Sequence, residues 1–260
     1  IKIAEDYKDS ATMGPLIHNQ DEINRLKNDF NVGLYNNLSD VKDNDTVIIR
    51  THGIPKNDLK NLKALNAKII NATCPFVTTP QQIVKKMSEE GYSILIFGDA
   101  DHPEVKGVQS YAENQDDVHI VLEPSDLENT IFKNNKIATV AQTTKKKEKY
   151  LEIVNYLILK NKEVRVFNTI CDATFENQDA ARELSKEVDI MIVIGGKNSS
   201  NTKQLHSICL ENCPDSYLIE NQTELDIHWF LDKNLCGVTA GASTPDWIIQ
   251  QVVDKIESIN

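Results

Sequence analysis

The sequence predicts an α/β protein whose mostly parallel sheets carry helices on their faces. Short runs of β-forming residues alternate with segments of helical periodicity along the chain, and this alternation is typical of parallel sheets. The strand-helix units fall into three stretches of similar length, which predict α/β domains over residues 1–74, 75–168 and 169–260. The stretches share a pattern and not a sequence, so we expect a pseudo-threefold arrangement without a sequence repeat.

Seven predicted strands end in a loop that holds a small polar, cysteine, histidine or glycine residue. These strand-and-loop segments lie at residues 47–53, 68–75, 94–104, 137–144, 164–174, 190–201 and 236–244. Further strands are expected at Val32 to Tyr35, His119 to Leu122 and Tyr217 to Ile219. Ligands of open parallel sheets bind just beyond the carboxyl ends of the strands. The reactive side chains are therefore concentrated where this fold class places an active site.

Apolar residues spaced three and four apart predict the helices between these strands. The helical patterns cover residues 23–30, 59–65, 83–87, 150–158, 181–184, 205–208 and 248–256. At the start of the sequence, Ile1, Ala4 and Tyr7 are spaced like the buried stripe of a helix. We expect this first segment to be a helix whose beginning has been cut off.

Charge and composition exclude several classes of protein. The 260 residues carry a formal net charge of −11, so nucleic acid and acidic membranes are not expected partners. The longest apolar runs, such as Ile190 to Ile194, are too short to span a bilayer. The five cysteines form no disulfide-framework pattern, and we expect a soluble protein of the reducing cytoplasm. An anionic ligand of such an acidic protein needs a local cluster of donors.

Two cysteines share an unusual context. Cys74 in ATCP and Cys171 in TICDAT each follow a predicted strand and precede a predicted helix. A thiol at a helix N-terminus has a lowered pKa, and the thiolate is the form that binds metals or attacks electrophiles. A small buried apolar residue is the alternative for each. By contrast, Cys209 and Cys213 span a helix end without nearby zinc ligands, and Cys236 opens a strand and is expected in the core.

Three histidines occupy predicted loops at the ends of elements: His18 in GPLIHN, His52 in RTHG and His102 in DHPE. A solitary loop histidine is usually just solvated, but three of them with Glu104 can converge on one anion and titrate near neutral pH. Pro103 separates His102 from Glu104, so we expect an extended segment that points both side chains to one side. That geometry offers one donor to a substrate and one carboxyl for proton transfer.

A second polar group follows the strand at 190–194. It consists of Asn198, Ser199, Ser200 and Asn201. Their hydroxyls and amides, with the free N–H groups of the next helix, can hold a phosphate. Ordinary helix capping explains serine and asparagine here equally well.

Ser243 in GAST and Thr143 in AQTT also lie at strand ends. Around Ser243, Thr244 and Pro245 are expected as the N-cap and first residue of the last helix. Thr143 either donates to a substrate oxygen or ends its strand. The sequence contains no GxGxxG motif and no P-loop motif, so nucleotide binding has no direct support.

Eight short motifs now point to one family. In chain order they are GPLIHN, RTHG, NATCPFVT, DHPEVKG, AQTT, TICDAT, KNSSN and GASTPD. Each motif alone is ordinary, but all eight in this order closely resemble the 4-hydroxy-3-methylbut-2-enyl diphosphate reductase family over essentially the whole chain. The resemblance implies three α/β domains around a central 4Fe-4S cluster, held by one cysteine from each of three strand-end loops.

The resemblance also implies an activity, which is the last step of the methylerythritol phosphate route to isoprenoids. The family reduces 4-hydroxy-3-methylbut-2-enyl diphosphate with two electrons and two protons, which gives isopentenyl and dimethylallyl diphosphates and water. An external electron donor such as flavodoxin or ferredoxin is implied.

By motif, Cys74 and Cys171 resemble two of the three cluster ligands, Glu104 the proton donor and Thr143 its polar neighbour. The residues that resemble the diphosphate cradle are His18, His52, His102, Ser199, Ser200, Asn201 and Ser243. Histidines, hydroxyls and amides then replace a lysine cluster, which explains how an acidic protein binds a diphosphate.

Two departures from the family pattern concern the first cysteine and Gly196. The family's first cysteine lies in a glycine- and phenylalanine-rich segment just before the helix with which this sequence starts, so we expect an N-terminally truncated chain. Gly196 stands where some relatives have serine. Two alternatives remain: a zinc-dependent hydrolase that uses Cys74, Cys171 and a histidine, and a metal-free phosphometabolite-binding protein.

Overall fold

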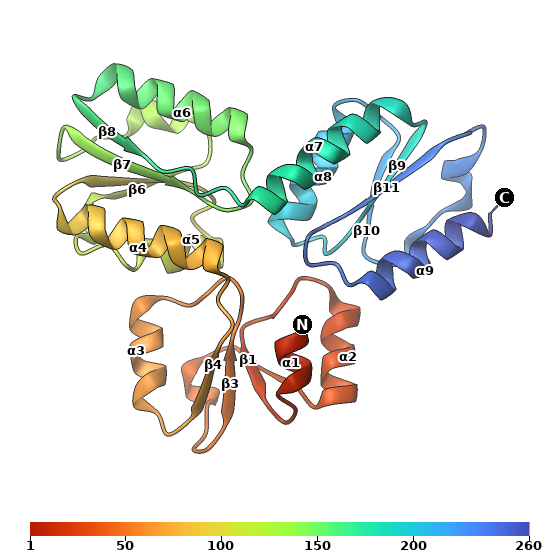
Figure 1. Cartoon of the computed structure of the whole chain (residues 1–260), viewed down its shortest axis with the longest axis horizontal. Helices are drawn as coiled ribbons and strands as arrows, with labels where there is room; N and C mark the ends of the chain where they lie inside the picture. Colours follow the sequence, from red (N-terminus) through yellow and green to blue (C-terminus); the bar gives the residue numbers. More distant parts are fainter. Residues whose placement is uncertain (260) are drawn as a thin grey trace. The chain divides into compact units, whose positions relative to one another are not determined.

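The computed structural model describes residues 1–259, whose strands form three parallel sheets (Figure 1). The chain divides into two compact units. The first unit consists of Ile1–Leu16 and Leu26–Cys171 and contains two of the sheets, and the second consists of Ile17–Arg25 and the chain from Asp172 onward. The predicted α/β class is confirmed. The three-domain division at 74/75 and 168/169 stays a prediction.

The first sheet has the strand order β2-β1-β3-β4, and all its neighbouring strands are parallel. The strands are β1 (Ala11–Met13), β2 (Gly33–Tyr35), β3 (Thr46–Ile49) and β4 (Lys68–Asn71). The helices of this part of the chain are α1 (Lys2–Asp6), α2 (Gln20–Phe30) and α3 (Lys56–Ala64). Met13, Val47, Ile49, Ile54 and Leu62 form its buried core.

The central strand β1 is not among the strands that the sequence predicts. Its three residues are all buried and pair with β2 on one side and β3 on the other. The strand is followed by Gly14 and contains one β-branched residue, so it lacks the run of β-formers that marks the other strands. Burial and ladder hydrogen bonds from both neighbours stabilise it, and neither is visible in a local pattern.

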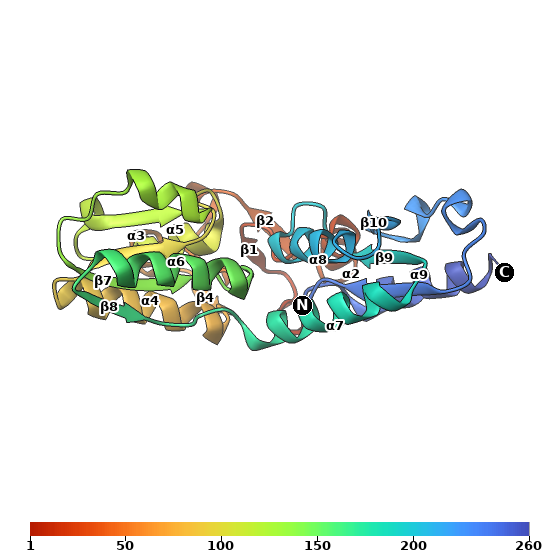
Figure 2. The same ribbon diagram turned by 90° about the horizontal axis from the view of Figure 1, so that it is seen from above.

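The second sheet has the order β6-β5-β7-β8, again all parallel. Its strands are β5 (Ser93–Phe97), β6 (Val118–Val121), β7 (Lys136–Ala141) and β8 (Glu163–Val166). Helices α4 (Pro75–Glu89) and α5 (Pro103–Gln109) lie on one face, and α6 (Lys147–Lys160) lies on the other (Figure 1). The view from above again shows α6 alongside β7 and β8 (Figure 2).

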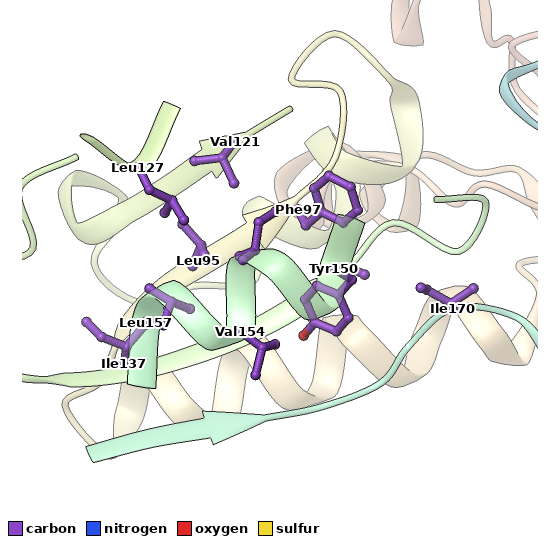
Figure 3. Close-up of a cluster of buried hydrophobic side chains, with 11 residues drawn as sticks. Leu95, Phe97, Val121, Leu127, Ile137, Tyr150, Val154, Leu157 and Ile170 are labelled. Atoms are coloured by element: carbon purple, nitrogen blue, oxygen red, sulfur yellow. The ribbon is translucent and has the colours of Figure 1, made fainter. Parts of the chain in front are cut away.

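Both faces of β5 are buried, which explains its unbroken apolar run. Leu95 and Phe97 pack with Tyr150 and other residues of α6 (Figure 3), whereas Ile94 and Ile96 pack on the α4 and α5 side. The buried Tyr150 hydroxyl donates to the Thr139 carbonyl at 2.9 Å. Phe97 and Ala141, the last residues of β5 and β7, therefore belong to a closely packed core. The loops that follow these two strands contain the candidate site.

The third sheet, in the second unit, has the order β10-β9-β11. Its parallel strands are β9 (Ile190–Ile194), β10 (Ser216–Ile219) and β11 (Cys236–Ala240). Residues of α7 (Asp172–Glu187) and α8 (Ser200–Leu210) share one buried cluster with β9, and residues of α9 (Asp246–Glu257) share another. The helices thus cover both faces of the fully buried β9.

The remaining regular elements are short 3₁₀ turns. They lie at Leu38–Asp40, Gln115–Asp117, Pro124–Asn129, Gln222–Glu224 and Ile227–Phe230. Among the described residues, no helix combines the length and the apolar composition that a bilayer crossing requires.

Candidate active site

The carboxyl of Glu104 is held by one residue, Thr143. Glu104 is the second residue of α5 and is 1% exposed. Thr143, which follows β7, donates its backbone N–H to Oε1 at 2.7 Å and its hydroxyl to Oε2 at 2.7 Å. The fold therefore brings together the two residues that the sequence singles out from DHPE and AQTT.

Thr143 is in turn bonded to the segment that carries Cys171. The Thr143 carbonyl accepts the N–H of Cys171 at 3.0 Å. Nearby, the hydroxyl of Thr169 accepts from the Ala141 N–H at 2.8 Å and donates to the Ala141 carbonyl at 2.6 Å. These bonds place a thiol-bearing residue one hydrogen bond away from the residue that holds Glu104.

Thr169 and Gln142 are positioning residues that the sequence analysis missed. The Gln142 N–H donates to the Phe97 carbonyl at 2.8 Å, and its side-chain oxygen accepts the N–H of Asp99 at 3.0 Å. Gln142 thus ties the loop before α5 to the end of β7. The available signal was the placement of polar residues directly beside Thr143 and Cys171 at strand ends.

Burial raises the pKa of the Glu104 carboxyl above its ordinary value. The two hydrogen bonds from Thr143 and the charge of Lys145 act in the opposite direction, but burial is the larger effect. Glu104 consequently keeps its proton to a higher pH than an exposed glutamate. This is the behaviour required of a general acid near neutral pH.

The expected extended conformation at His102-Pro103-Glu104 is wrong. Pro103 is the first residue of helix α5, and only His102 is extended, with φ −69° and ψ 134°. Proline suits this position because the first turn of a helix leaves its N–H groups unpaired. His102 caps the helix, and its Nδ1 accepts the Glu104 N–H at 3.2 Å. The neutral ring then carries its proton on Nε2, where it can donate to a ligand.

His52 lies against His102 in the same unit, and Cys74 is bonded to the residue before His52. The rings of His52 and His102 meet edge to face, with centroids 5.3 Å apart. The N–H of Cys74 donates to the carbonyl of Thr51, next to His52, at 3.0 Å. Cys74 is extended, as its following proline predicts, and forms the N-cap of α4. The first unit therefore gathers both predicted ligand cysteines, two histidines and the carboxyl onto connected strand-end loops.

The five cysteines separate into two kinds. Cys74, Cys171 and Cys236 are half-buried, so Cys236 is not the fully buried residue that was expected, while Cys209 and Cys213 are buried. Burial, with a contribution from the Cys213 thiol, raises the pKa of Cys209 to about 11 and that of Cys236 to about 11. The thiols of Cys209 and Cys236 therefore stay protonated at neutral pH and are poor metal ligands.

In the second unit, the start of α8 contains a buried amide without a partner. Asn201 is 7% exposed, and neither of its amide atoms has a hydrogen-bond partner in the part of the chain that the structure describes. Buried polar atoms are nearly always paired, so this amide has the arrangement of a ligand contact. Ser199 is the N-cap of α8 and accepts the Thr202 N–H at 3.3 Å, which supports the capping interpretation for that residue.

The GAST loop lies against the same helix start. An added Cβ at Gly195 or Gly241 would lie 2.6 Å or 2.4 Å from the Thr202 hydroxyl, so both positions require glycine for this close approach. The loop presents Ser243 as an exposed residue. The expected cap of the last helix is wrong: α9 begins at Asp246 with Pro245 as N-cap, because the Thr244 hydroxyl donates instead to the Ile194 carbonyl at 3.1 Å.

His18 belongs to the second unit through the segment Ile17–Arg25. Its carbonyl lies 2.1 Å from the position that a Cβ on Gly196 would take. The Asn19 amide donates to the Glu220 carbonyl at 3.1 Å, which anchors the segment. Glycine at 196 therefore permits the His18 backbone to lie directly against the end of β9.

The comparison with known families decides the assignment, because the LytB protein family matches residues 1–257. The chain belongs to the LytB family. Among curated relatives of this LytB chain, the 4-hydroxy-3-methylbut-2-enyl diphosphate reductases of Sulfurovum sp. and Nitratiruptor sp. are each 63% identical over 259 residues. Each alignment covers 100% of this chain and 93% of the relative. The family resemblance drawn from the eight motifs is confirmed.

Solved structures of LytB-related reductases share the fold. A structure of (E)-4-hydroxy-3-methyl-but-2-enyl diphosphate reductase, described as the terminal enzyme of the non-mevalonate pathway, is 42% identical with a TM-score of 0.71. That alignment covers 99% of this chain and 92% of the other. A reductase from Plasmodium falciparum is 27% identical with a TM-score of 0.89, and its alignment covers 97% of this chain and 80% of the other.

Proposed function

We propose that this LytB chain removes the hydroxyl group of 4-hydroxy-3-methylbut-2-enyl diphosphate by reduction. Two electrons and two protons give isopentenyl or dimethylallyl diphosphate and water, as the last step of the methylerythritol phosphate route. The observation that carries the proposal is the hydrogen-bonded series from the buried Glu104 carboxyl through Thr143 to the backbone of Cys171. This series supports the proposal because it connects the acid, through Thr143, to the backbone of a candidate redox-centre ligand.

Glu104 is the proton donor of the proposed reaction. Burial raises the pKa of its carboxyl above the ordinary value, and Thr143 fixes the orientation of both oxygens. One proton goes to the departing hydroxyl, which leaves as water, and a second goes to the carbon skeleton. A buried donor of fixed orientation also limits proton exchange with bulk water.

Cys74 and Cys171 are the proposed ligands of a 4Fe-4S cluster. Both thiols are half-exposed, and both lie at strand ends that precede helices. Burial raises the pKa of Cys209 and the pKa of Cys236 to about 11. The donor set of the first unit therefore fits the group. Such a cluster, when bound, supplies electrons and a Lewis-acidic iron.

By motif, the residues of the proposed diphosphate cradle are His18, His52, His102, Ser199, Ser200, Asn201 and Ser243. The N–H groups at the start of α8 and the unpaired Asn201 amide are suited to phosphate oxygens. An external donor such as flavodoxin or ferredoxin and a cytoplasmic location complete the proposal.

Metal analysis of anaerobically purified protein tests this function against its alternatives. We expect iron and acid-labile sulfide, a visible absorption band and reductive turnover with a chemical electron donor, in a chain extended before Ile1 by the family's cysteine segment. Stoichiometric zinc with hydrolytic activity would instead support a zinc hydrolase. Diphosphate binding without any metal would support a binding protein.

A further inference from the structure

Arg50 differs from the other arginines of the chain in having no counter-ion. Of the four arginines, Arg25 pairs with Glu22 at 2.7 Å, Arg165 with Glu90 at 2.8 Å and Arg182 with Asp179 at 2.9 Å. In residues 1–259, no carboxylate lies within ion-pair distance of the Arg50 guanidinium, and its buried Nε has no hydrogen-bond partner.

This lone guanidinium is also half-buried. Burial alone lowers the pKa of Arg50 from its ordinary value, with no neighbouring charge to oppose the effect. A buried cation normally has a hydrogen-bonded anion beside it, because desolvation otherwise destabilises the charged group. The planar guanidinium has five N–H donors arranged to bind a carboxylate or phosphate through two oxygens. The Arg50 guanidinium therefore has the surroundings of an anion-binding group.

Arg50 lines a cleft of about 470 Å³ that lies entirely within the first unit. Asn36, Asn37 and Lys106 add polar and cationic groups to the cleft wall. An added Cβ on Gly14 would lie 2.8 Å from the Arg50 Cζ, and Gly14 has φ +75°. Only glycine at this position both takes that backbone conformation and leaves room for the guanidinium.

Two aspartates moderate the charge of the cleft without neutralising Arg50. Asp58 and Asp101 also line it, but Asp101 pairs with Lys106 at 3.1 Å and its side chain is 96% exposed. Neither aspartate is within ion-pair distance of Arg50. The cleft therefore contains one uncompensated cation and several neutral donors, which suit a single anionic group.

The cleft is separate from the carboxyl site but close to it in sequence. Gly53 and Pro103 line the cleft and directly follow His52 and His102, whereas Glu104 and Thr143 are not among the lining residues. A guanidinium, an ammonium and two amides provide more donors than the two oxygens of a carboxylate accept. A phosphate, with at least three terminal oxygens, uses them more fully.

We propose that the Arg50 cleft is a second anion site, which binds the phosphate group of a small phosphorylated metabolite independently of the diphosphate cradle. The volume of the cleft is in the range of small-molecule sites. The proposal does not depend on the reductase reaction, because it rests on the charge and geometry of the first unit alone.

Calorimetric titration with inorganic pyrophosphate as the probe tests this site. In a His52→Ala variant, which weakens the cradle, we expect residual binding that Arg50→Met reduces by about 10- to 100-fold, as is typical of a charged hydrogen-bonding group. Arg165→Met is the matched control, since Arg165 already has a carboxylate partner, and it should leave this binding unchanged.

Other outcomes would overturn the proposal. They are the absence of residual binding in His52→Ala, residual binding that does not respond to Arg50→Met, or an equal loss in Arg165→Met, which would indicate non-specific attraction. Thermal unfolding without pyrophosphate provides a second check, because removal of an uncompensated half-buried charge should not lower the melting temperature. A marked fall would assign Arg50 a structural role instead. Loss of cradle binding in Asn201→Ala concerns the proposed function and leaves the Arg50 site unaffected.

Discussion

Glu104 in the first unit and Asn201 in the second are both buried polar residues at the start of a helix, yet they differ in their partners. Both carboxylate oxygens of Glu104 accept hydrogen bonds from Thr143. Both amide atoms of Asn201 are unpaired in residues 1–259. The first group is paired within the protein, and the second keeps its hydrogen-bonding capacity available.

The difference follows from what each group is proposed to do. A proton donor must keep one orientation and a raised pKa through the reaction, so its environment is built into the protein. A substrate contact must leave its hydrogen-bonding capacity available, at a cost in stability that ligand binding removes. Substitution of Glu104 should therefore affect turnover, and substitution of Asn201 should affect affinity.

The largest expected effect comes from the two ligand cysteines of the first unit. Cys74→Ser or Cys171→Ser should abolish cluster retention and activity, because a serine hydroxyl does not replace a thiolate on iron. Cys209→Ser and Cys213→Ser serve as controls and should retain iron. Iron and sulfide analysis of the four anaerobically purified variants is the measurement. Equal iron content in all four variants would contradict the assignment of Cys74 and Cys171 as cluster ligands.

The next largest effect concerns Glu104 itself. Glu104→Gln should lose turnover by about 10²- to 10⁴-fold, the usual contribution of general acid catalysis, while iron content and diphosphate affinity stay unchanged. The amide keeps the size of the carboxyl and can still accept the Thr143 N–H. The turnover rate is measured by steady-state reduction with a chemical electron donor. Glu113→Gln is the control, because the Glu113 side chain is exposed. A rate within a few-fold of the unmodified protein would exclude Glu104 from the mechanism.

The same substitution should change how stability depends on pH. Because the folded-state pKa of Glu104 is raised, the folded protein binds this proton more tightly than the unfolded chain. The free energy of unfolding should fall as pH rises from the unfolded-state pKa to the folded-state pKa. Glu104→Gln should remove that part of the decline, which chemical denaturation across the acidic to neutral range would reveal.

A smaller effect is expected in the second unit. Asn201→Ala should weaken diphosphate binding by about 1.5 to 3 kcal/mol, the usual value for a hydrogen bond to a charged group, without lowering thermal stability, since no internal bond is lost. Calorimetry with the substrate and a melting curve test both parts. Asn234→Ala is the matched control, because Asn234 is exposed and is not one of the proposed cradle residues. Unchanged affinity in Asn201→Ala would contradict the cradle.

The smallest effect is a shift in a pH profile. The Thr143 hydroxyl bond lowers the pKa of Glu104, so Thr143→Val should raise that pKa. A reaction that needs protonated Glu104 slows as pH rises through this pKa, and the basic limb of kcat/KM should therefore move to higher pH. Thr144→Val is the control. A basic limb that stays in place, or moves to lower pH, would show that Glu104 does not set it.

The sequence was sufficient for most of the fold because its signals are local. The continuous apolar runs of β5 and β9 and the periodic helices α4, α6 and α9 follow from residues that are neighbours in the chain. Strand β1 and helix α5 were not predicted from the sequence. Burial between two partner strands stabilises the first, and a proline at the helix start with a histidine cap directs the second.

For the candidate site, the sequence by itself determined which residue types stand at the strand ends, and thereby the family and its chemistry. Only the tertiary structure decided which of them meet. The bonds from Thr143 to Glu104 and to Cys171, the missing partner of Asn201 and the missing counter-ion of Arg50 each depend on segments far apart in the chain. Hydrogen bonds act over about 3 Å, and the spacing of residues along a sequence does not set distances on that scale between separate strands.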